Sequence, residues 1–301
     1  MSDARPASEL VDVACALCGG RDRTLRFRDG PYSVVTCTNC DLTYVTPRRG
    51  DGALLDEVYD ESYWRSQAAR ERGYTDYRAD AELYRETYRR RWAVLEPHVG
   101  APGRVLDIGC AAGYFLEVAR AKGWDVFGFE PSDAIRKTAA AALGEERVRG
   151  GRLLDAGFER ASFDLVTLWD VIEHTPDPLA TLRAAAELAK PTAKLVVETQ
   201  NVRSVAARVL GKRWQHYKHA EHLHHFHLGT LTRALELTGW RLVASTKRFG
   251  GKLVSPHFIV ERAKRVHPIL STLVSPVELL GRRGLYVNPF DELIVVAERA
   301  R

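Results

Sequence analysis

Residues 104–114 read Arg104-Val-Leu-Asp-Ile-Gly-Cys-Ala-Ala-Gly-Tyr114, and this stretch decides the fold. An apolar, β-branched run reaches Asp107, glycines follow at positions 109 and 113, and a helical pattern begins at Phe115. This order predicts a strand, a tight glycine-containing turn and a helix N-terminus, which together let backbone approach a nucleotide-like ligand closely. The spacing G-x-x-x-G is neither the dinucleotide fingerprint G-x-G-x-x-G nor a phosphate loop ending in G-K-[ST].

Residues 104–130 also carry a family motif. The order Asp107-x-Gly109-x-x-x-Gly113, with Glu130 closing the next predicted strand, resembles the first motif of class I S-adenosylmethionine (SAM) methyltransferases. The resemblance implies an α/β fold with a Rossmann-like, doubly wound sheet of seven strands that binds SAM. It further implies that Asp107 organises the first loop near the amino-acid end of SAM. Glu130, 23 residues further on, is then expected to accept both ribose hydroxyls.

The same resemblance extends the cofactor site beyond these two acids. Trp169 or Asp170, at the end of the fourth strand, is expected beside the methionine portion of SAM. Asp155 either reaches the adenine amine or is a surface acid, and the residues leave both alternatives open. Cys110 lies inside the motif and is also expected to serve as a small buried residue. The predicted cofactor-binding residues are Asp107, Gly109, Cys110, Gly113, Tyr114, Glu130, Trp169 and Asp170.

From residue 104 onward, apolar runs alternate with helical patterns. Such alternation, with near-continuous apolar strands, predicts a parallel sheet that helices cover on both faces. Ser132 and the pair Asp177-Pro178 are expected to start two of the helices. Strands are predicted at residues 104–109, 125–130, 147–150, 163–169, 193–199, 241–247 and 293–298. Helices are predicted at residues 114–122, 132–143, 177–190 and 229–238.

The character of the sequence changes along the chain, which predicts three parts. Residues 10–50 hold all but one of the five cysteines, with short strands expected at 24–27 and 32–37. Residues 51–99 are rich in aromatic side chains and predict a helix over 77–95, so they form a helical linker or cap. The methyltransferase-like domain spans 100–301 and contains inserts at 201–227 and 249–292. Long insertions at strand ends are usually binding loops or lids.

Four cysteines near the start of the chain have the spacing of a zinc site. Cys15-x2-Cys18 and Cys37-x2-Cys40 are separated by 18 residues, which matches the pattern C-x2-C-x15–20-C-x2-C. Thiolates at i and i+3 of a tight turn both face one tetrahedral zinc ion, and two such turns close its shell. A pair of redox dithiols is the alternative, but no thioredoxin-like βαβ context surrounds either pair. We therefore predict a structural zinc ion held by Cys15, Cys18, Cys37 and Cys40.

The segment after the fourth predicted strand resembles one particular group of methyltransferases. Asp170-Val-Ile-Glu173-His174-Thr-Pro-Asp177-Pro resembles the corresponding segment of ubiquinone-type O-methyltransferases and their bacterial relatives. Some of those relatives bind a divalent cation through an acidic-x-x-Glu-His set. The resemblance therefore implies a divalent cation at Asp170, Glu173 and His174, although Asp170 replaces the more usual glutamate. The alternative is local structure, with Glu173 and His174 capping the turn through hydrogen bonds to backbone.

Six of the ten histidines lie in the 12 residues from His216 to His227. Within this segment, Glu221-His222-Leu resembles the Glu-His-Leu-x-x-Phe segment of the same relatives. Methyl transfer to a hydroxyl needs a base near the sulfonium, and an imidazole with a near-neutral pKa suits that role. The spacing is not the His-Glu-x-x-His of a zincin. We predict His222 and His174 as catalytic residues and the remaining histidines as solvated loop residues or ring-stacking partners.

The composition excludes several classes of protein. The chain has 301 residues, 45% hydrophobic and 28% charged, as is ordinary for a globular protein. No run of 18 apolar residues occurs and the polar N-terminus has no signal-peptide core, so we expect a cytoplasmic protein without a transmembrane segment. The net charge of +5 comes with interspersed acids, so it does not indicate a nucleic-acid partner.

Residues 262–284 combine basic and aliphatic side chains. An interfacial amphipathic helix that contacts a membrane surface is one interpretation. Because Pro268 and Pro276 interrupt a single long helix, we favour a substrate lid or a homodimer contact. The four-cysteine part also resembles the start of zinc-containing sugar C-methyltransferases, but their further C-terminal domain has no counterpart here.

The sequence as a whole predicts a SAM-dependent methyltransferase. We expect O-methylation of a small molecule or a glycan, because SAM supplies the electrophile and the protein adds proximity, alignment and a base. Two alternatives stay open: an RNA-modifying methyltransferase that reads its substrate with the zinc module, and a non-catalytic scaffold that binds a protein partner. The intact first motif and Glu130 argue against the scaffold.

Overall fold

A mixed seven-stranded sheet forms the centre of the molecule in the computed structural model, which describes residues 10–50, 61–64, 77–266, 268–281 and 284–300. The strand order is β12-β15-β10-β9-β6-β7-β8, and only β15 runs antiparallel to its neighbours. This arrangement confirms the predicted α/β sheet of seven strands. The strands are β6 (Arg104–Ile108), β7 (Asp125–Phe129), β8 (Val148–Arg149), β9 (Phe163–Trp169), β10 (Ala189–Gln200), β12 (Trp240–Thr246) and β15 (Glu292–Arg299).

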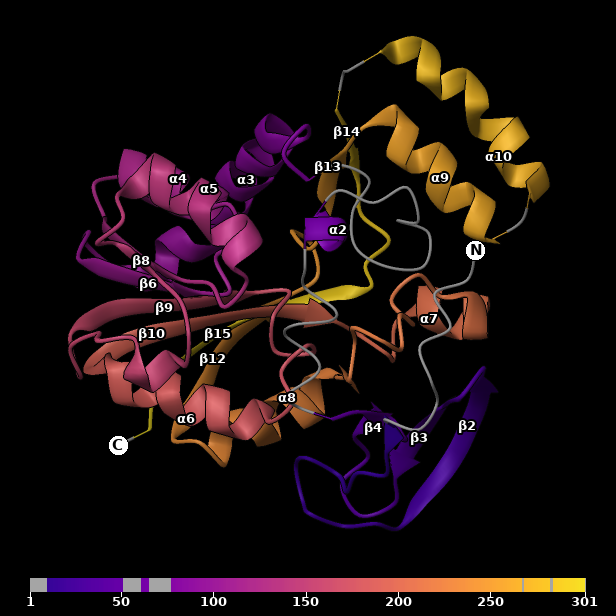
Figure 1. Cartoon of the computed structure of the whole chain (residues 1–301), viewed down its shortest axis with the longest axis horizontal. Coiled ribbons are helices and arrows are strands. Elements are labelled where there is room, and N and C mark those ends of the chain that lie inside the picture. The colour runs from indigo at the N-terminus through magenta and orange to yellow at the C-terminus, as the bar shows by residue number, and fades with distance from the viewer. Residues whose placement is uncertain (1–9, 51–60, 65–76, 267, 282–283, 301) are drawn as a thin grey trace.

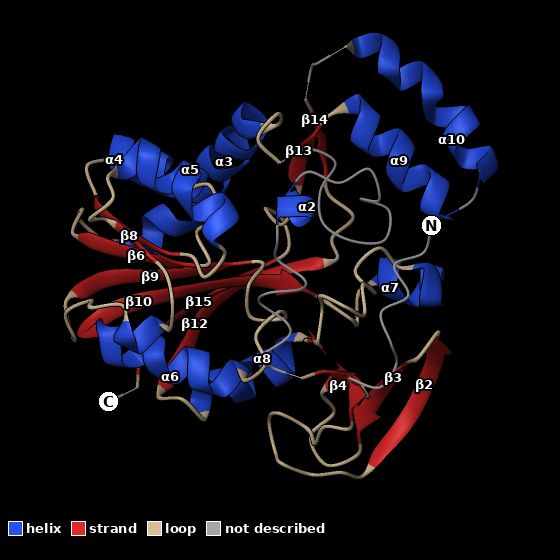
Figure 2. Ribbon diagram, in the orientation of Figure 1, coloured by secondary structure: helices blue, strands red, loops and turns tan. Residues whose placement is uncertain are grey.

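Helices cover both faces of this sheet, as Figure 2 shows. On one face lie α3 (Ala81–Val99), α4 (Tyr114–Ala121) and α5 (Asp133–Leu143), and on the other lie α6 (Pro178–Leu188) and α8 (Leu228–Glu236). The central strands are buried on both sides, which explains their near-continuous apolar sequences. Because these strands run parallel, the polar residues that follow them lie at one edge of the sheet, where ligands of open α/β folds bind.

One of the two predicted helix caps is absent, and two helices have boundaries that differ from the predicted ones. Asp177 caps α6 through a bond from the Ala180 amide (2.9 Å), as predicted, but Ser132 makes no side-chain bond to its helix. Helix α6 ends at Leu188, because Ala189 already pairs with Phe163 at the start of β10. Helix α3 begins at Ala81 and continues to Val99.

The cysteine-bearing segment forms a small sheet that includes a strand from far along the chain. Its order is β11-β4-β3-β2, and β11 comes from the predicted insert 201–227. His224 and His225 pair antiparallel with Tyr44 and Thr43, and the Val45 amide donates to the carbonyl of residue 223 (2.9 Å). The strands are β2 (Arg23–Asp29), β3 (Tyr32–Cys37), β4 (Thr43–Val45) and β11 (His224–His225), beside a separate pair β1 (Leu10–Val11) and β5 (Arg48–Arg49).

The late insert forms a separate projection beyond the sheet. Figure 1 shows α9 (Pro256–Val266) and α10 (Pro268–Val274) side by side above it, so proline 268 separates two helices as the sequence predicts. The remaining elements are β13 (Lys252–Val254) paired with β14 (Leu285–Val287), α2 (Glu61–Trp64), α7 (Val205–Leu210) and the short 3-10 helices Leu153–Asp155, Gly211–Arg213 and Ser275–Leu280. Among the described residues, no helix has the length and apolarity that crossing a membrane requires.

The four predicted cysteine ligands meet at one point. The sulfurs of Cys15 and Cys40 lie 3.3 Å apart, those of Cys18 and Cys37 lie 3.5 Å apart, and all four lie within 4.8 Å of one another. Four sulfurs at about 2.3 Å from zinc are separated by about 3.8 Å, so the cluster fits a tetrahedral ion. The fifth cysteine, Cys110, belongs to the central domain.

We predict that the protein holds one zinc ion per chain, because four thiolates form a closed shell with no open position. The double substitution Cys37→Ser plus Cys40→Ser removes half of that shell and should release the metal, which elemental analysis of the purified protein measures. Cys110→Ser is the matched control and should keep full zinc content. Metal-free wild-type protein prepared without chelator, or full zinc content in the double variant, contradicts the assignment.

Candidate functional site

A cavity of about 460 Å³ opens at the carboxyl ends of the central strands. Its walls include the glycine-containing loop after β6, the ends of β7 and β9, helix α3, the histidine-rich segment and the late insert. Residues far apart in sequence thus surround one space of the size that small-molecule sites have. Seven of the ten residues predicted for cofactor binding and catalysis line it, namely Gly109, Cys110, Glu130, Trp169, Asp170, His174 and His222.

Glu130 is fixed at the end of β7 by two backbone amides. One carboxylate oxygen accepts from the Ala111 amide (2.9 Å) and the other from the Ser132 amide (2.8 Å). Burial raises the pKa of Glu130 to about 7, against the opposing effect of the two amide donors. The carboxylate lines the cavity, and each oxygen keeps a lone pair for a further donor such as a hydroxyl.

The two motif glycines have different tasks. Gly109 lines the cavity at φ +75°, and a Cβ there would meet the Val171 side chain at 2.5 Å. Gly113, at φ +83°, does not line the cavity; a Cβ there would press on Leu143 at 2.9 Å. Gly113 therefore serves the packing of α4 against α5, whereas Gly109 leaves the loop backbone open to the cavity.

Three other predicted cofactor residues support the loop in different ways. Asp107 is buried beneath it and accepts a bond from Thr167 (2.6 Å), and burial raises its pKa to about 8. Cys110 lines the cavity, and its sulfur would lie 2.6 Å from a Cβ at position 128. Tyr114 lies outside the cavity wall, where its ring stacks on Tyr77 at 5.5 Å. Only the cysteine of these three borders the cavity directly.

Asp155 takes the surface alternative left open by the sequence. It is exposed at the end of a short 3-10 helix and pairs with Arg152 at 3.4 Å. Leu153, two residues earlier, lines the cavity instead.

A buried charge network closes one side of the cavity, and sequence reasoning missed most of it. Lys252 of the late insert contacts Asp170 (2.7 Å) and Glu292 (3.0 Å), while Arg91 of α3 contacts Glu198 (2.5 Å). Burial opposes the charge on Lys252, but the nearby carboxylates raise its pKa well above the usual range. Asp170 is held at φ +54°, a left-handed conformation rare for a non-glycine residue. The clearest sequence signal for this network is Glu198, an acid that directly follows the apolar run 195–197 of β10.

The structure brings the two predicted catalytic histidines together. The ring centroids of His174 and His222 lie 4.6 Å apart, and Nδ1 of His174 lies 3.0 Å from the carbonyl oxygen of Glu221. Burial lowers the pKa of His174 to about 4 and lowers that of His222 well below its usual value. Nδ1 of His222 has no hydrogen-bond partner in the part of the chain that is described. Both rings line the cavity, and both are neutral at physiological pH.

The predicted cation set of Asp170, Glu173 and His174 is rearranged. The ligand atoms that lie within 4.8 Å of one another belong to Glu173, His174 and His222. Asp170 instead falls in a second group with Glu198 and Glu292, where Lys252 supplies the positive charge. The left-handed turn at Asp170 separates the two groups, and local sequence spacing could not show it.

The other histidines of the segment are structural rather than solvated. His224 and His225 are buried in β11, and His227 caps α8 by accepting from the Gly229 amide (3.1 Å). His219 is also buried, with its ring against Phe27 at 5.9 Å. The expectation of solvated loop residues is therefore wrong for these four, whereas the ring-stacking alternative holds for His219 and for His225, whose ring lies 4.8 Å from that of Tyr217.

Comparisons with known proteins agree with this geometry. A family model described as a methyltransferase domain matches residues 77–245. The ubiquinone biosynthesis O-methyltransferase of Xanthomonas axonopodis pv. citri is 37% identical over 142 residues, which cover 42% of this chain and 58% of that protein. The enzyme of the same name from Idiomarina loihiensis is 33% identical over 117 residues, covering 36% and 46%. The chain thus matches about half the length of these relatives.

A solved structure supports the fold. A chain in the complex between the Haloferax volcanii Trm112 methyltransferase activator and a methyltransferase superposes with a TM-score of 0.51 at 15% identity, covering 74% of this chain and 95% of that chain. The family model matches more than half of the chain, over a region that includes the Asp107-x-Gly109 loop, Glu130 and the paired histidines. The protein therefore belongs to the methyltransferase-domain family.

Proposed function

We propose that the protein transfers a methyl group from SAM to a hydroxyl oxygen of a small molecule or a glycan. The pair His174 and His222, two neutral imidazoles in contact at the wall of the cavity, is the observation that carries this proposal. Oxygen as acceptor is further supported by the O-methyltransferase names of the two curated relatives.

The residues around the loop fit SAM. Glu130 offers acceptor oxygens for the two ribose hydroxyls, and Gly109 leaves backbone exposed beside it. Trp169 and Asp170 border the same cavity on the side where the methionine portion is expected. When bound, SAM supplies a methyl group on a positively charged sulfur. The chain's own residues then have to align the acceptor oxygen with that methyl group and exclude water.

In this proposal, His222 takes the proton from the acceptor hydroxyl. Its ring is neutral because burial lowers its pKa, so the ring nitrogens are not both protonated at physiological pH. Nδ1 has no hydrogen-bond partner among the described residues, which leaves that atom available to the acceptor. His174 contacts the His222 ring and orients it, with its own Nδ1 against the Glu221 carbonyl.

A divalent cation is a second way to use the same residues. Glu173, His174 and His222 offer one carboxylate and two imidazoles within 4.8 Å, a donor set that suits a transition-metal ion. Such an ion would polarise the acceptor hydroxyl and lower its pKa. In that case His222 acts as a ligand rather than as the base, and activity requires the metal.

Glu130→Ala should weaken binding of S-adenosylhomocysteine by about 1.5–3 kcal/mol, or about 10- to 150-fold, because charge-assisted hydrogen bonds to the ribose are lost. Isothermal titration calorimetry measures the affinity. Glu145→Ala, which changes an exposed acid outside the cavity, is the control and should bind like wild type. An unchanged affinity in a folded Glu130→Ala protein removes this residue from the cofactor site.

His222→Ala should lower turnover about 10²- to 10⁴-fold while the affinity for S-adenosylhomocysteine stays within a few-fold, because the base acts only in the chemical step. The matched control is His257→Ala, an exposed histidine on α9, which should keep wild-type turnover. Metal content separates the two mechanisms: a base-dependent enzyme is fully active with only the one zinc ion of the cysteine cluster, whereas a cation-dependent enzyme needs a second ion per chain and gains turnover when that ion is added. Wild-type turnover in His222→Ala contradicts both.

The pH profile gives an independent check. A base with a lowered pKa stays neutral until the pH falls through that lowered value, so activity is retained below pH 6.5, the usual pKa of histidine. We therefore expect the acid limb of kcat, measured at saturating SAM so that the titration of Glu130 does not contribute, to lie below pH 6.5. An acid limb centred at about 6.5 or above indicates an exposed histidine as the base.

A further inference from the structure

A second cavity of about 320 Å³ lies where the cysteine-bearing sheet meets the central domain. It is bordered by Val13, Ala14 and Ala16, by Arg48, by the start of α6 and by His224 of β11. Pro176 borders this cavity and the larger one, so the two spaces adjoin at this residue. We call it the junction cavity.

His224 is an unsatisfied polar group in the wall of the junction cavity. The residue is 2% exposed, and neither ring nitrogen makes a hydrogen bond of regular geometry within the described ranges, although the backbone of Thr175 and Pro176 lies near the ring. A neutral imidazole offers one donor and one acceptor. Buried polar groups without partners are rare in native proteins, and a ligand is one explanation.

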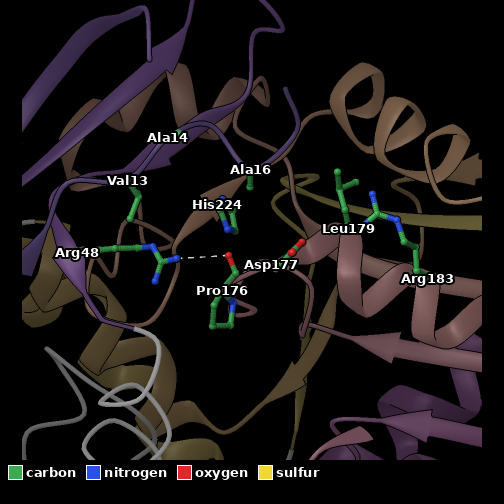
Figure 3. Close-up of a pocket in the computed structure, with 9 residues that line it drawn as sticks. All are labelled: Val13, Ala14, Ala16, Arg48, Pro176, Asp177, Leu179, Arg183 and His224. Atoms are coloured by element: carbon green, nitrogen blue, oxygen red, sulfur yellow. Dashed lines mark hydrogen bonds between the residues drawn. The ribbon is translucent and has the colours of Figure 1, made fainter. Parts of the chain in front are cut away.

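Two guanidinium groups flank this histidine. Figure 3 shows Arg48 on one side of His224 and Arg183 on the other. Arg48 is 5% exposed and donates to the carbonyl oxygens of Arg49 (3.2 Å) and Pro176 (3.4 Å). Arg183 is exposed, and the described structure gives it no hydrogen bond or ion pair, so its fork of donors is available to a ligand.

The remaining polar group of the cavity is an acceptor. Asp177 uses one oxygen to cap α6, through the Ala180 amide at 2.9 Å, and its carboxylate borders the junction cavity. Two cations with a neutral histidine suit an oxyanion, while a carboxylate suits hydroxyl donors. A metal ion does not fit, because His224 and Asp177 belong to no group of three close ligands among the residues described.

We propose that the junction cavity binds a sugar-sized, polyhydroxylated ligand that carries a phosphate or carboxylate group. Arg183, Arg48 and the ring of His224 take the oxyanion, and Asp177 accepts from hydroxyls. Because Pro176 borders both cavities, this ligand is the anionic end of the methyl acceptor, an assignment that rests on the proposed function. The volume suits a monosaccharide-sized group rather than an ion alone.

The test is calorimetric titration with glucose 1-phosphate, glucuronate, glucose and inorganic phosphate at fixed ionic strength. Wild-type protein should bind at least one of the two anionic sugars about tenfold more tightly than it binds glucose or inorganic phosphate. The tighter of the two identifies the oxyanion as phosphate or carboxylate. Arg183→Gln should weaken that binding about tenfold, because it removes a charge-assisted donor from an exposed side chain without disturbing the core.

Two controls keep the result specific. Arg233→Gln, an exposed helical arginine outside both cavities, should bind like wild type. Titration of the same samples with S-adenosylhomocysteine measures binding at the cofactor cavity. Loss of cofactor binding is therefore distinguishable from loss of sugar binding at the junction cavity. The proposal is overturned if both anionic sugars bind no more tightly than glucose or no more tightly than inorganic phosphate. Unchanged binding in Arg183→Gln also overturns it.

Discussion

The pairing of β11 with β4 is the interaction on which the site depends. Two residues of the histidine-rich segment add an edge strand to the cysteine-bearing sheet, and the Val45 amide extends the pairing to residue 223. This pairing fixes the position of His222, which directly precedes the paired residues. On the other side, the amides of residues 223 and 224 donate to the carbonyl of Glu173, next to His174. Residues 223 and 224 thus connect the cysteine-bearing sheet to the backbone next to His174, and they hold both proposed catalytic histidines in position.

The turn at Cys40 strengthens the contact between the cysteine-bearing sheet and the histidine-rich segment. Asp41 follows Cys40 in a left-handed conformation, and its carboxylate contacts Nε2 of His227 (3.1 Å) and the Arg203 guanidinium. A metal ion in the cysteine cluster would fix the turn that presents Asp41, and through it the end of the histidine segment. The module is therefore a scaffold for one wall of the cavity. The opposite wall depends on the buried charges of Arg91 and Lys252, which tie α3 and the late insert to the sheet.

The sequence predicted the features that depend on local pattern. Apolar runs predicted the strands, the spacing of the cysteines predicted that their side chains meet, and Asp107-x-Gly109 predicted the glycine-containing turn after β6. It could not predict contacts made by short or irregular segments. Strand β11 has two residues and no alternation, and the pairing of Lys252 with Asp170 joins positions 82 residues apart. The packing of Gly113 against helix α5 also could not be predicted, because only the fold places that helix beside it.

Hydrogen–deuterium exchange measured before and after zinc removal tests the central claim most directly, namely that the cysteine module holds the histidine segment at the SAM cavity. Residues 43–45 pair with residues 223–225 across this junction, so the amides of both segments should lose protection together when the metal is removed. The central strands β6 and β9 should keep theirs. Unchanged protection of residues 223–225 in protein shown to be free of zinc would contradict the account.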